Sequence, residues 1–70
     1  MKVVELAHQP VELYKVLKWE GVTDSGAAAK STIVAGLVMV NGEIETRKRR
    51  KIVVGDIIAV AEEEFIMQLK

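Results

Sequence analysis

Hydrophobic and polar positions along the chain change their period near its middle. The short apolar run at residues 3–6 is rich in β-branched side chains and predicts a first strand. From Pro10 to about Glu20, apolar positions recur at helical spacing. Pro10 suits the first turn of this helix because its missing N–H costs nothing there. Gly21 then predicts a left-handed cap, so a first helix is expected between these limits.

A second helix is marked at both of its ends. Asp24 or Ser25 can accept a hydrogen bond from an early backbone N–H, and three successive alanines follow, which are strong helix formers. Ala29 and Ile33 lie four residues apart and share a face that can be buried. Gly36 closes the helix. Because the two predicted helices are joined by a very short connection, we expect a tight αα-hairpin.

After Gly36 the pattern becomes extended. Asn41-Gly42 between two short runs is the strongest hairpin signal in the chain, because both residues tolerate the positive φ of a type I′ turn. In that register Met39 and Ile44 lie opposite each other. A third extended run at residues 52–54 breaks at Gly55-Asp56 and resumes at residues 57–61. A last strand is expected at residues 65–69, after a charged turn at Glu62-Glu63-Glu64.

Length and composition limit the architecture to one small α+β domain of 70 residues and 7.7 kDa. The predicted order is β-α-α-β-β-β-β, a helical hairpin packed on a small, mostly antiparallel sheet, with a core motif at about residues 13–60. There are no cysteines, which excludes a disulfide scaffold, a cysteine zinc site and a thiol nucleophile. The longest apolar run, residues 33–40, is far too short for a membrane span, and no signal peptide is evident. We therefore expect a cytoplasmic protein.

Charge is balanced overall but not locally. Ten basic and ten acidic residues give a formal net charge of zero, yet five of the cations are consecutive, from Arg47 to Lys51, whereas the acids are dispersed apart from residues 62–64. Arginine guanidinium groups can fork onto phosphate oxygens, and a polyanion that binds such a run releases counterions. Ser25 and Lys30 at the start of the second helix add a hydroxyl and a charge near a positive dipole end. Spacing alone leaves open whether the helix start and the run share one face, and an ordinary solvated loop is the alternative.

Several of these segments together resemble the S-four RNA-binding domain, the αL motif named after ribosomal small-subunit protein four. The helix, glycine, strand and Asn-Gly order is fairly specific, and the small standalone YbcJ-type branch of the family is the most similar. The resemblance rests on Leu17-Lys18, Ser25-Gly26-Ala27-Ala28-Ala29-Lys30, Ile33, Gly36, Val38-Met39-Val40-Asn41-Gly42, Glu45-Thr46-Arg47-Lys48-Arg49 and Gly55-Asp56-Ile57-Ile58.

The resemblance implies binding of structured RNA, chiefly ribosomal RNA or tRNA, by the second helix, the hairpin and the basic loop. Two departures shift the expected contribution toward the loop, because many family members have arginine at the position of Gly26 and a long polar residue at that of Ala28. By position, the implied contacts are Ser25, Gly26, Lys30, Asn41, Arg47, Lys48, Arg49, Arg50 and Lys51.

Some residues also have a purely structural interpretation. Turn geometry explains Asn41, and Ser25 is a common helix cap. Trp19 could stack on a base, but as one of three aromatic residues in a small protein it is expected to pack in the core. His8 is the only histidine, with no cysteine and no acidic cluster beside it, so a metal site is not expected.

The sequence therefore predicts a non-catalytic protein without cofactor or metal that binds structured RNA, in translation or ribosome assembly. No Walker or dinucleotide glycine loop is present, and residues 62–64 form a turn rather than an opposed carboxylate pair. The alternative is a protein-interaction adaptor whose basic loop meets an acidic partner. DNA binding ranks third, because the second helix offers mostly Ala, Ser and Thr rather than side chains that read bases.

Overall fold

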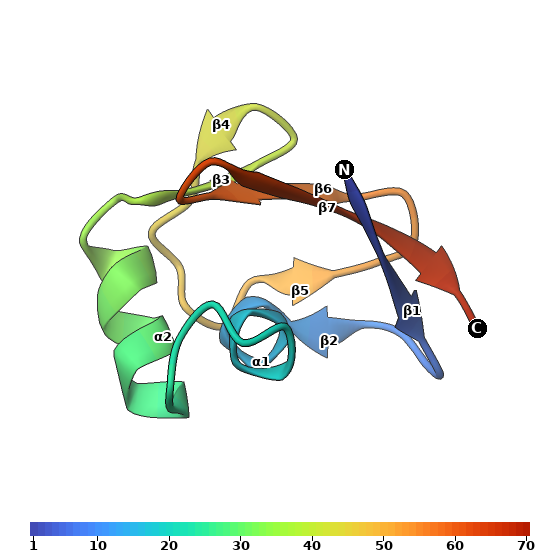
Figure 1. The fold of residues 1–70 in the computed structure, drawn as a ribbon, viewed down its shortest axis with the longest axis horizontal. Helices are drawn as coiled ribbons and strands as arrows, with labels where there is room; N and C mark the ends of the chain where they lie inside the picture. The colour runs from blue at the N-terminus through green and yellow to red at the C-terminus, as the bar shows by residue number, and fades with distance from the viewer.

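The computed structural model describes all of residues 1–70 and has two layers (Figure 1). One layer is a five-stranded sheet in the order β1-β7-β6-β3-β4, and the other holds both helices and a two-stranded sheet of β2 and β5. Neither helix has the length and apolarity needed to traverse a bilayer. The strands are β1 (Lys2–Leu6), β2 (Val11–Glu12), β3 (Val38–Val40), β4 (Glu43–Ile44), β5 (Lys51–Ile52), β6 (Ile57–Val60) and β7 (Glu63–Leu69), and the helices are α1 (Leu13–Trp19) and α2 (Gly26–Val34).

The large sheet buries one face and exposes the other. β1 runs parallel to β7, whereas the remaining pairs are antiparallel, so alternate side chains of each strand point toward the helices. The outer face carries exposed apolar side chains such as Met39 and Ile44. The core between the layers consists of Val4, Leu6, Val11, Leu13, Val16, Leu17, Ala29, Ile33, Val38, Val40, Ile52, Ile58, Val60, Phe65 and Met67.

Both helices end as the glycine positions predict. Gly21 and Gly36 have positive φ, and each donates its N–H back to the last turn of its helix. The following residues, Val22 and Leu37, donate to Leu17 and Thr32, which completes a Schellman motif at each end. The two helices pack against each other, so the predicted αα-hairpin is confirmed.

The predicted start of the first helix at Pro10 is wrong. Pro10 precedes β2, and α1 begins only at Leu13, after Glu12 in extended conformation. No side chain caps this helix start. Instead, the backbone N–H groups of Leu13 and Tyr14 donate to carbonyl oxygens of residues 50 and 48, at 2.9 and 3.2 Å. A segment far along the chain therefore decides where the helix begins, and a local pattern could not reveal it.

The predicted strand positions are correct for the central hairpin and shift elsewhere. Met39 does pair with Ile44, and Asn41 and Gly42 both have positive φ, as a type I′ turn requires. The single extended run expected at 52–54 and 57–61 is instead two strands in different sheets, because β5 pairs with β2 in the small sheet whereas β6 pairs with β3 in the large one. The expected charged turn is shorter, because Ala61 and Glu62 alone make it, both at positive φ, and β7 already starts at Glu63.

Candidate functional site

The basic run forms the connection between the large and the small sheet. Arg47 to Arg50 lie in the loop after β4, and Lys51 is the first residue of β5. The backbone of this loop is fixed, because two of its carbonyl oxygens accept the hydrogen bonds from the start of α1 and the Arg50 N–H donates to the Arg47 carbonyl at 3.1 Å. The five charges therefore sit on a defined backbone and not on a mobile tail.

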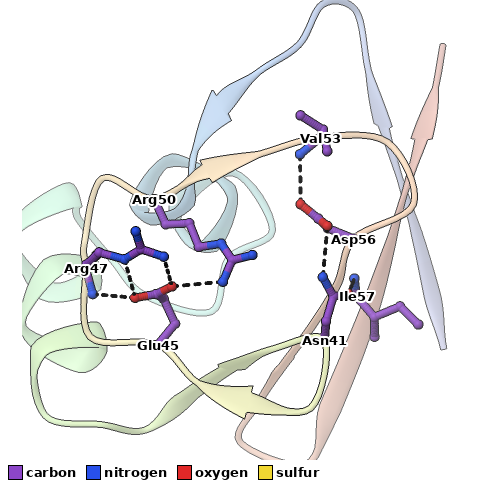
Figure 2. Close-up of polar contacts among 7 residues, drawn as sticks. All are labelled: Asn41, Glu45, Arg47, Arg50, Val53, Asp56 and Ile57. Carbon is purple, nitrogen blue, oxygen red and sulfur yellow. Dashed lines mark hydrogen bonds and ion pairs between the residues drawn. The ribbon is translucent and has the colours of Figure 1, made fainter.

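Glu45 anchors the arginines at the β4 end of this loop (Figure 2). Its side chain is only 8% exposed and accepts a bidentate pair from Arg47, Nε to Oε2 at 3.0 Å and Nη2 to Oε1 at 2.9 Å. The Arg47 backbone N–H and Nη1 of Arg50 donate to the same carboxylate, each at 2.9 Å. The fork that the sequence suggested for a phosphate is thus occupied on Arg47 by a carboxylate of the chain itself.

These contacts set the charge state of Glu45. Hydrogen bonds from the Arg47 side chain and backbone, together with that from Arg50, outweigh the effect of burial and lower the pKa of Glu45 to about 2. The carboxylate stays ionised at neutral pH and below, so the contact between Glu45 and its arginines persists under any physiological condition.

Glu12 has the corresponding role for Arg49. Its Oε2 accepts from Nη1 of Arg49 at 3.0 Å, and its Oε1 lies 3.5 Å from Nζ of Lys15, one turn along α1. The Arg49 hydrogen bond is the main reason that the pKa of Glu12 is lowered. Glu45 and Glu12 together therefore engage all three arginines of the basic run, although the acids are dispersed along the sequence.

Tyr14 joins the basic run to the second helix. Nζ of Lys30 lies 4.6 Å from the centre of the Tyr14 ring, and Cζ of Arg49 lies 5.3 Å from the same centre. The ring also packs beside Gly26, where an added Cβ would lie 3.6 Å from its edge. The loop and the start of α2, whose relation the spacing left open, thus meet on one aromatic side chain.

Three lysines of this region have no carboxylate within ion-pair distance: Lys30, Lys48 and Lys51. Lys30 and Lys48 line one shallow depression with Ser31, Val34 and Ala35. We call the whole assembly the basic surface. It comprises Lys15, Lys30, Arg47, Lys48, Arg49, Arg50 and Lys51 with Glu12 and Glu45, and its seven cations and two carboxylates leave a formal charge of plus five.

The remaining predicted contacts have structural partners. Ser25 caps α2 by accepting from the Ala28 N–H at 3.1 Å. Asn41 uses its whole amide at the tip of the β3–β4 hairpin, donating to Asp56 at 3.0 Å and accepting from the Ile57 N–H at 2.9 Å (Figure 2). Figure 2 shows Asn41 beside Asp56 and apart from the Glu45 cluster. Their role in binding stays a prediction, as it does for every residue of the basic surface.

Sequence reasoning missed three residues that shape this site: Glu12, Tyr14 and Glu45. A signal existed for Glu12, because Lys15 follows it at helical i,i+3 spacing. Glu45 stands two residues before Arg47, but its burial and its bidentate contact with Arg47 arise only because the chain turns there.

Trp19, expected in the core, is instead 53% exposed. His8 belongs to no group of three or more metal-ligating side chains.

Comparison with known proteins gives consistent matches. A model of the S4 domain family matches residues 4–68. The chain is 52% identical over 54 residues to the protein of Escherichia coli (strain K12) named "Putative RNA-binding protein YbcJ", and the match covers 77% of each chain. The same values hold for "Uncharacterized protein YbcJ" of Shigella flexneri. The solution structure of YbcJ from E. coli, described as revealing an αL motif involved in RNA binding, superposes with a TM-score of 0.74 at 43% identity, over 97% of this chain and 87% of that chain. The α+β fold class and the resemblance inferred from the sequence are confirmed.

Proposed function

The chain belongs to the S4 domain family, and we propose that it is a non-catalytic protein that binds structured RNA through its basic surface. The RNA of this proposal is ribosomal RNA or tRNA, and the process is translation or ribosome assembly in the cytoplasm. The name of its E. coli relative supports RNA as the class of ligand. The contacts of the proposal are those implied at the outset, with Lys30 and Lys48 at their centre.

One observation carries this proposal: cations from two distant parts of the chain gather around Tyr14. Lys30 comes from α2 and Arg49 from the loop after β4, yet both lie over the same ring. A formally neutral protein gains nothing for its own stability from a local charge of plus five, because like charges repel. A polyanion relieves that repulsion and releases counterions, so the surface is suited to a phosphate backbone.

The geometry favours recognition of shape over recognition of sequence. The unpaired lysines present point charges, while Arg47, Arg49 and Arg50 already donate to carboxylates. Such groups contact phosphates at fixed spacing but do not distinguish bases. Structured RNA, whose backbone follows a defined path, fits this arrangement better than a flexible single strand.

The test is a matched pair of double variants, Lys30→Ala with Lys48→Ala against Lys2→Ala with Lys70→Ala. Both pairs remove two charges, but Lys2 and Lys70 belong to the chain ends, which lie away from α2 (Figure 1). With tRNA or ribosomal RNA fragments as probes, the wild type should show a slope of log affinity against log salt of about −2 to −4, for about three to five phosphate contacts. The first pair should weaken binding about tenfold or more and reduce that slope by about 1.5.

Equal RNA affinity for the two double variants, both folded, would contradict the proposal. Capture from lysate with and without ribonuclease separates RNA from an acidic protein as the partner on this surface. RNA-dependent capture that the Lys30 and Lys48 substitutions abolish supports RNA, whereas partners retained after nuclease treatment identify a protein ligand.

A further inference from the structure

Trp19 is exposed where a small protein would ordinarily bury its largest side chain. It is the only tryptophan among three aromatic residues, and 53% of its surface is accessible. It is the last residue of α1, and Lys15 lies on the same face of the helix, one turn earlier. The exposed part of the indole is therefore accessible to a ligand.

The indole helps to form a cavity of about 270 Å³. Lys15 and Lys51 line the same cavity, together with Glu12 and with His8 and Pro10 from the connection between β1 and β2. An apolar ring flanked by two ammonium groups is the combination with which proteins bind nucleotides outside a duplex, because the base stacks and the phosphate is neutralised. Glu12 is the one carboxylate of the cavity, and the hydrogen bond from Arg49 at 3.0 Å balances its charge, which leaves the cavity with the positive charges of Lys15 and Lys51.

This cavity continues the basic surface rather than forming a separate one. Lys51 lies opposite Glu12 in the register of the small sheet. Glu12 accepts a hydrogen bond from Arg49, which lies over the Tyr14 ring. An RNA backbone that follows the cations from Lys30 and Lys48 toward Lys51 therefore arrives at Trp19.

We propose that Trp19 is a stacking platform for one unpaired base of the bound RNA, with Lys15 and Lys51 contacting the phosphates on either side of it. The inference rests on the proposed function and narrows the ligand to structured RNA with a bulged or looped-out nucleotide next to a helix. A fully paired RNA helix has no unpaired base that could enter the cavity, so its phosphates contact only the cations of the basic surface.

The first experiment uses the intrinsic fluorescence of the single tryptophan. The probes are two hairpin RNAs that are identical except for one unpaired nucleotide in the stem of the first. Addition of the bulged hairpin should quench the indole emission strongly, because stacking places the base on the ring, whereas the fully paired hairpin should leave it nearly unchanged. Equal responses to both hairpins at saturation would overturn the inference.

The second experiment compares Trp19→Ala with Trp19→Phe in binding to the same hairpins. Trp19→Ala should weaken binding of the bulged hairpin about tenfold, the loss expected for one stacked base, and leave the paired hairpin unaffected. Trp19→Phe keeps an aromatic face and should retain most of the affinity. A purely structural role for the indole would change both hairpins alike.

The outcomes separate this inference from the function on which it rests. If Trp19→Ala binds the bulged hairpin as tightly as the wild type does, the stacking platform is refuted while RNA binding stands. If the wild type binds neither these hairpins nor tRNA and ribosomal RNA fragments, the proposed function fails first and the platform fails with it.

Discussion

The basic surface has two regions that differ in what their charges contact. Around Glu45, the guanidinium groups of Arg47 and Arg50 converge on a carboxylate whose side chain is only 8% exposed. Around Tyr14, Lys30 lies over an aromatic ring and Lys48 shares its depression, with no carboxylate within ion-pair distance of either. The contacts of the first region hold the shape of the loop, whereas the lysine charges of the second have no carboxylate partner.

This difference shows that the number of cations in a run overstates the number that lack a carboxylate partner. The sequence suggested that the run binds phosphates, with its arginines as the better donors. In the structure the arginines of the run donate to Glu45 and Glu12, whereas Lys48 and Lys51 have no carboxylate within ion-pair distance. Substituting all three arginines would therefore test folding as much as binding, which is why the test of function uses lysines.

The largest expected effect on the Glu45 region comes from Glu45→Gln. This change removes the charge that four donor groups share, and the free energy of unfolding should fall by about 1–2 kcal/mol. Urea titration measures it, with Glu43→Gln as the control because Glu43 is an exposed carboxylate only two residues away, in β4. Similar losses for both variants would show that Glu45 is no more important than a surface acid.

Acid should abolish the difference in unfolding free energy between the wild type and Glu45→Gln over a defined pH range. The pKa of Glu45 is about 2 in the folded protein against an ordinary value of 4.5, so its contribution is complete above about pH 4.5 and disappears as the pH falls through about 2. Unfolding free energies of the wild type and Glu45→Gln should therefore converge over this range, as followed by denaturant titration at each pH. A difference that stays constant down to the lower limit would contradict the assigned pKa.

The smallest effect is expected at Tyr14. Tyr14→Leu removes the ring that Lys30 and Arg49 both approach, and the free energy of unfolding should fall by about 0.5–1 kcal/mol, the value of an exposed cation–π contact. Tyr14→Phe keeps the ring and serves as the control. Thermal denaturation of the three proteins measures the effect, and equal stability of the Leu and Phe variants would show that the ring does not tie the loop to α2.

Local features of the fold could be predicted from the sequence, and distant pairings could not. Asn41-Gly42 fixes its hairpin through backbone preferences of two residues, and Gly21 and Gly36 end their helices for the same reason. The start of α1 escaped prediction because its first N–H groups bond to the loop around residue 48. The β2–β5 pair escaped too, since two-residue strands leave no period in the sequence.

The candidate site also has features that the local sequence predicts and contacts that it does not. The cluster of cations is visible in the sequence, but its partners are not, because Glu12 stands 37 residues from Arg49. The exposure of Trp19 depends on which face of α1 the rest of the chain covers. Residue type alone had predicted that Trp19 is buried in the core.

The pairing of the first strand with the last has a consequence for how this protein is made. β1 lies alongside β7 over its whole length, and α1 takes its initial hydrogen-bond acceptors from residues 48 and 50. A nascent chain that stops short of these segments lacks a neighbour for its leading strand and acceptors for its leading helix. Productive folding of this domain must therefore wait until β7 has left the ribosomal tunnel, and loss of residues 63–69 should be poorly tolerated.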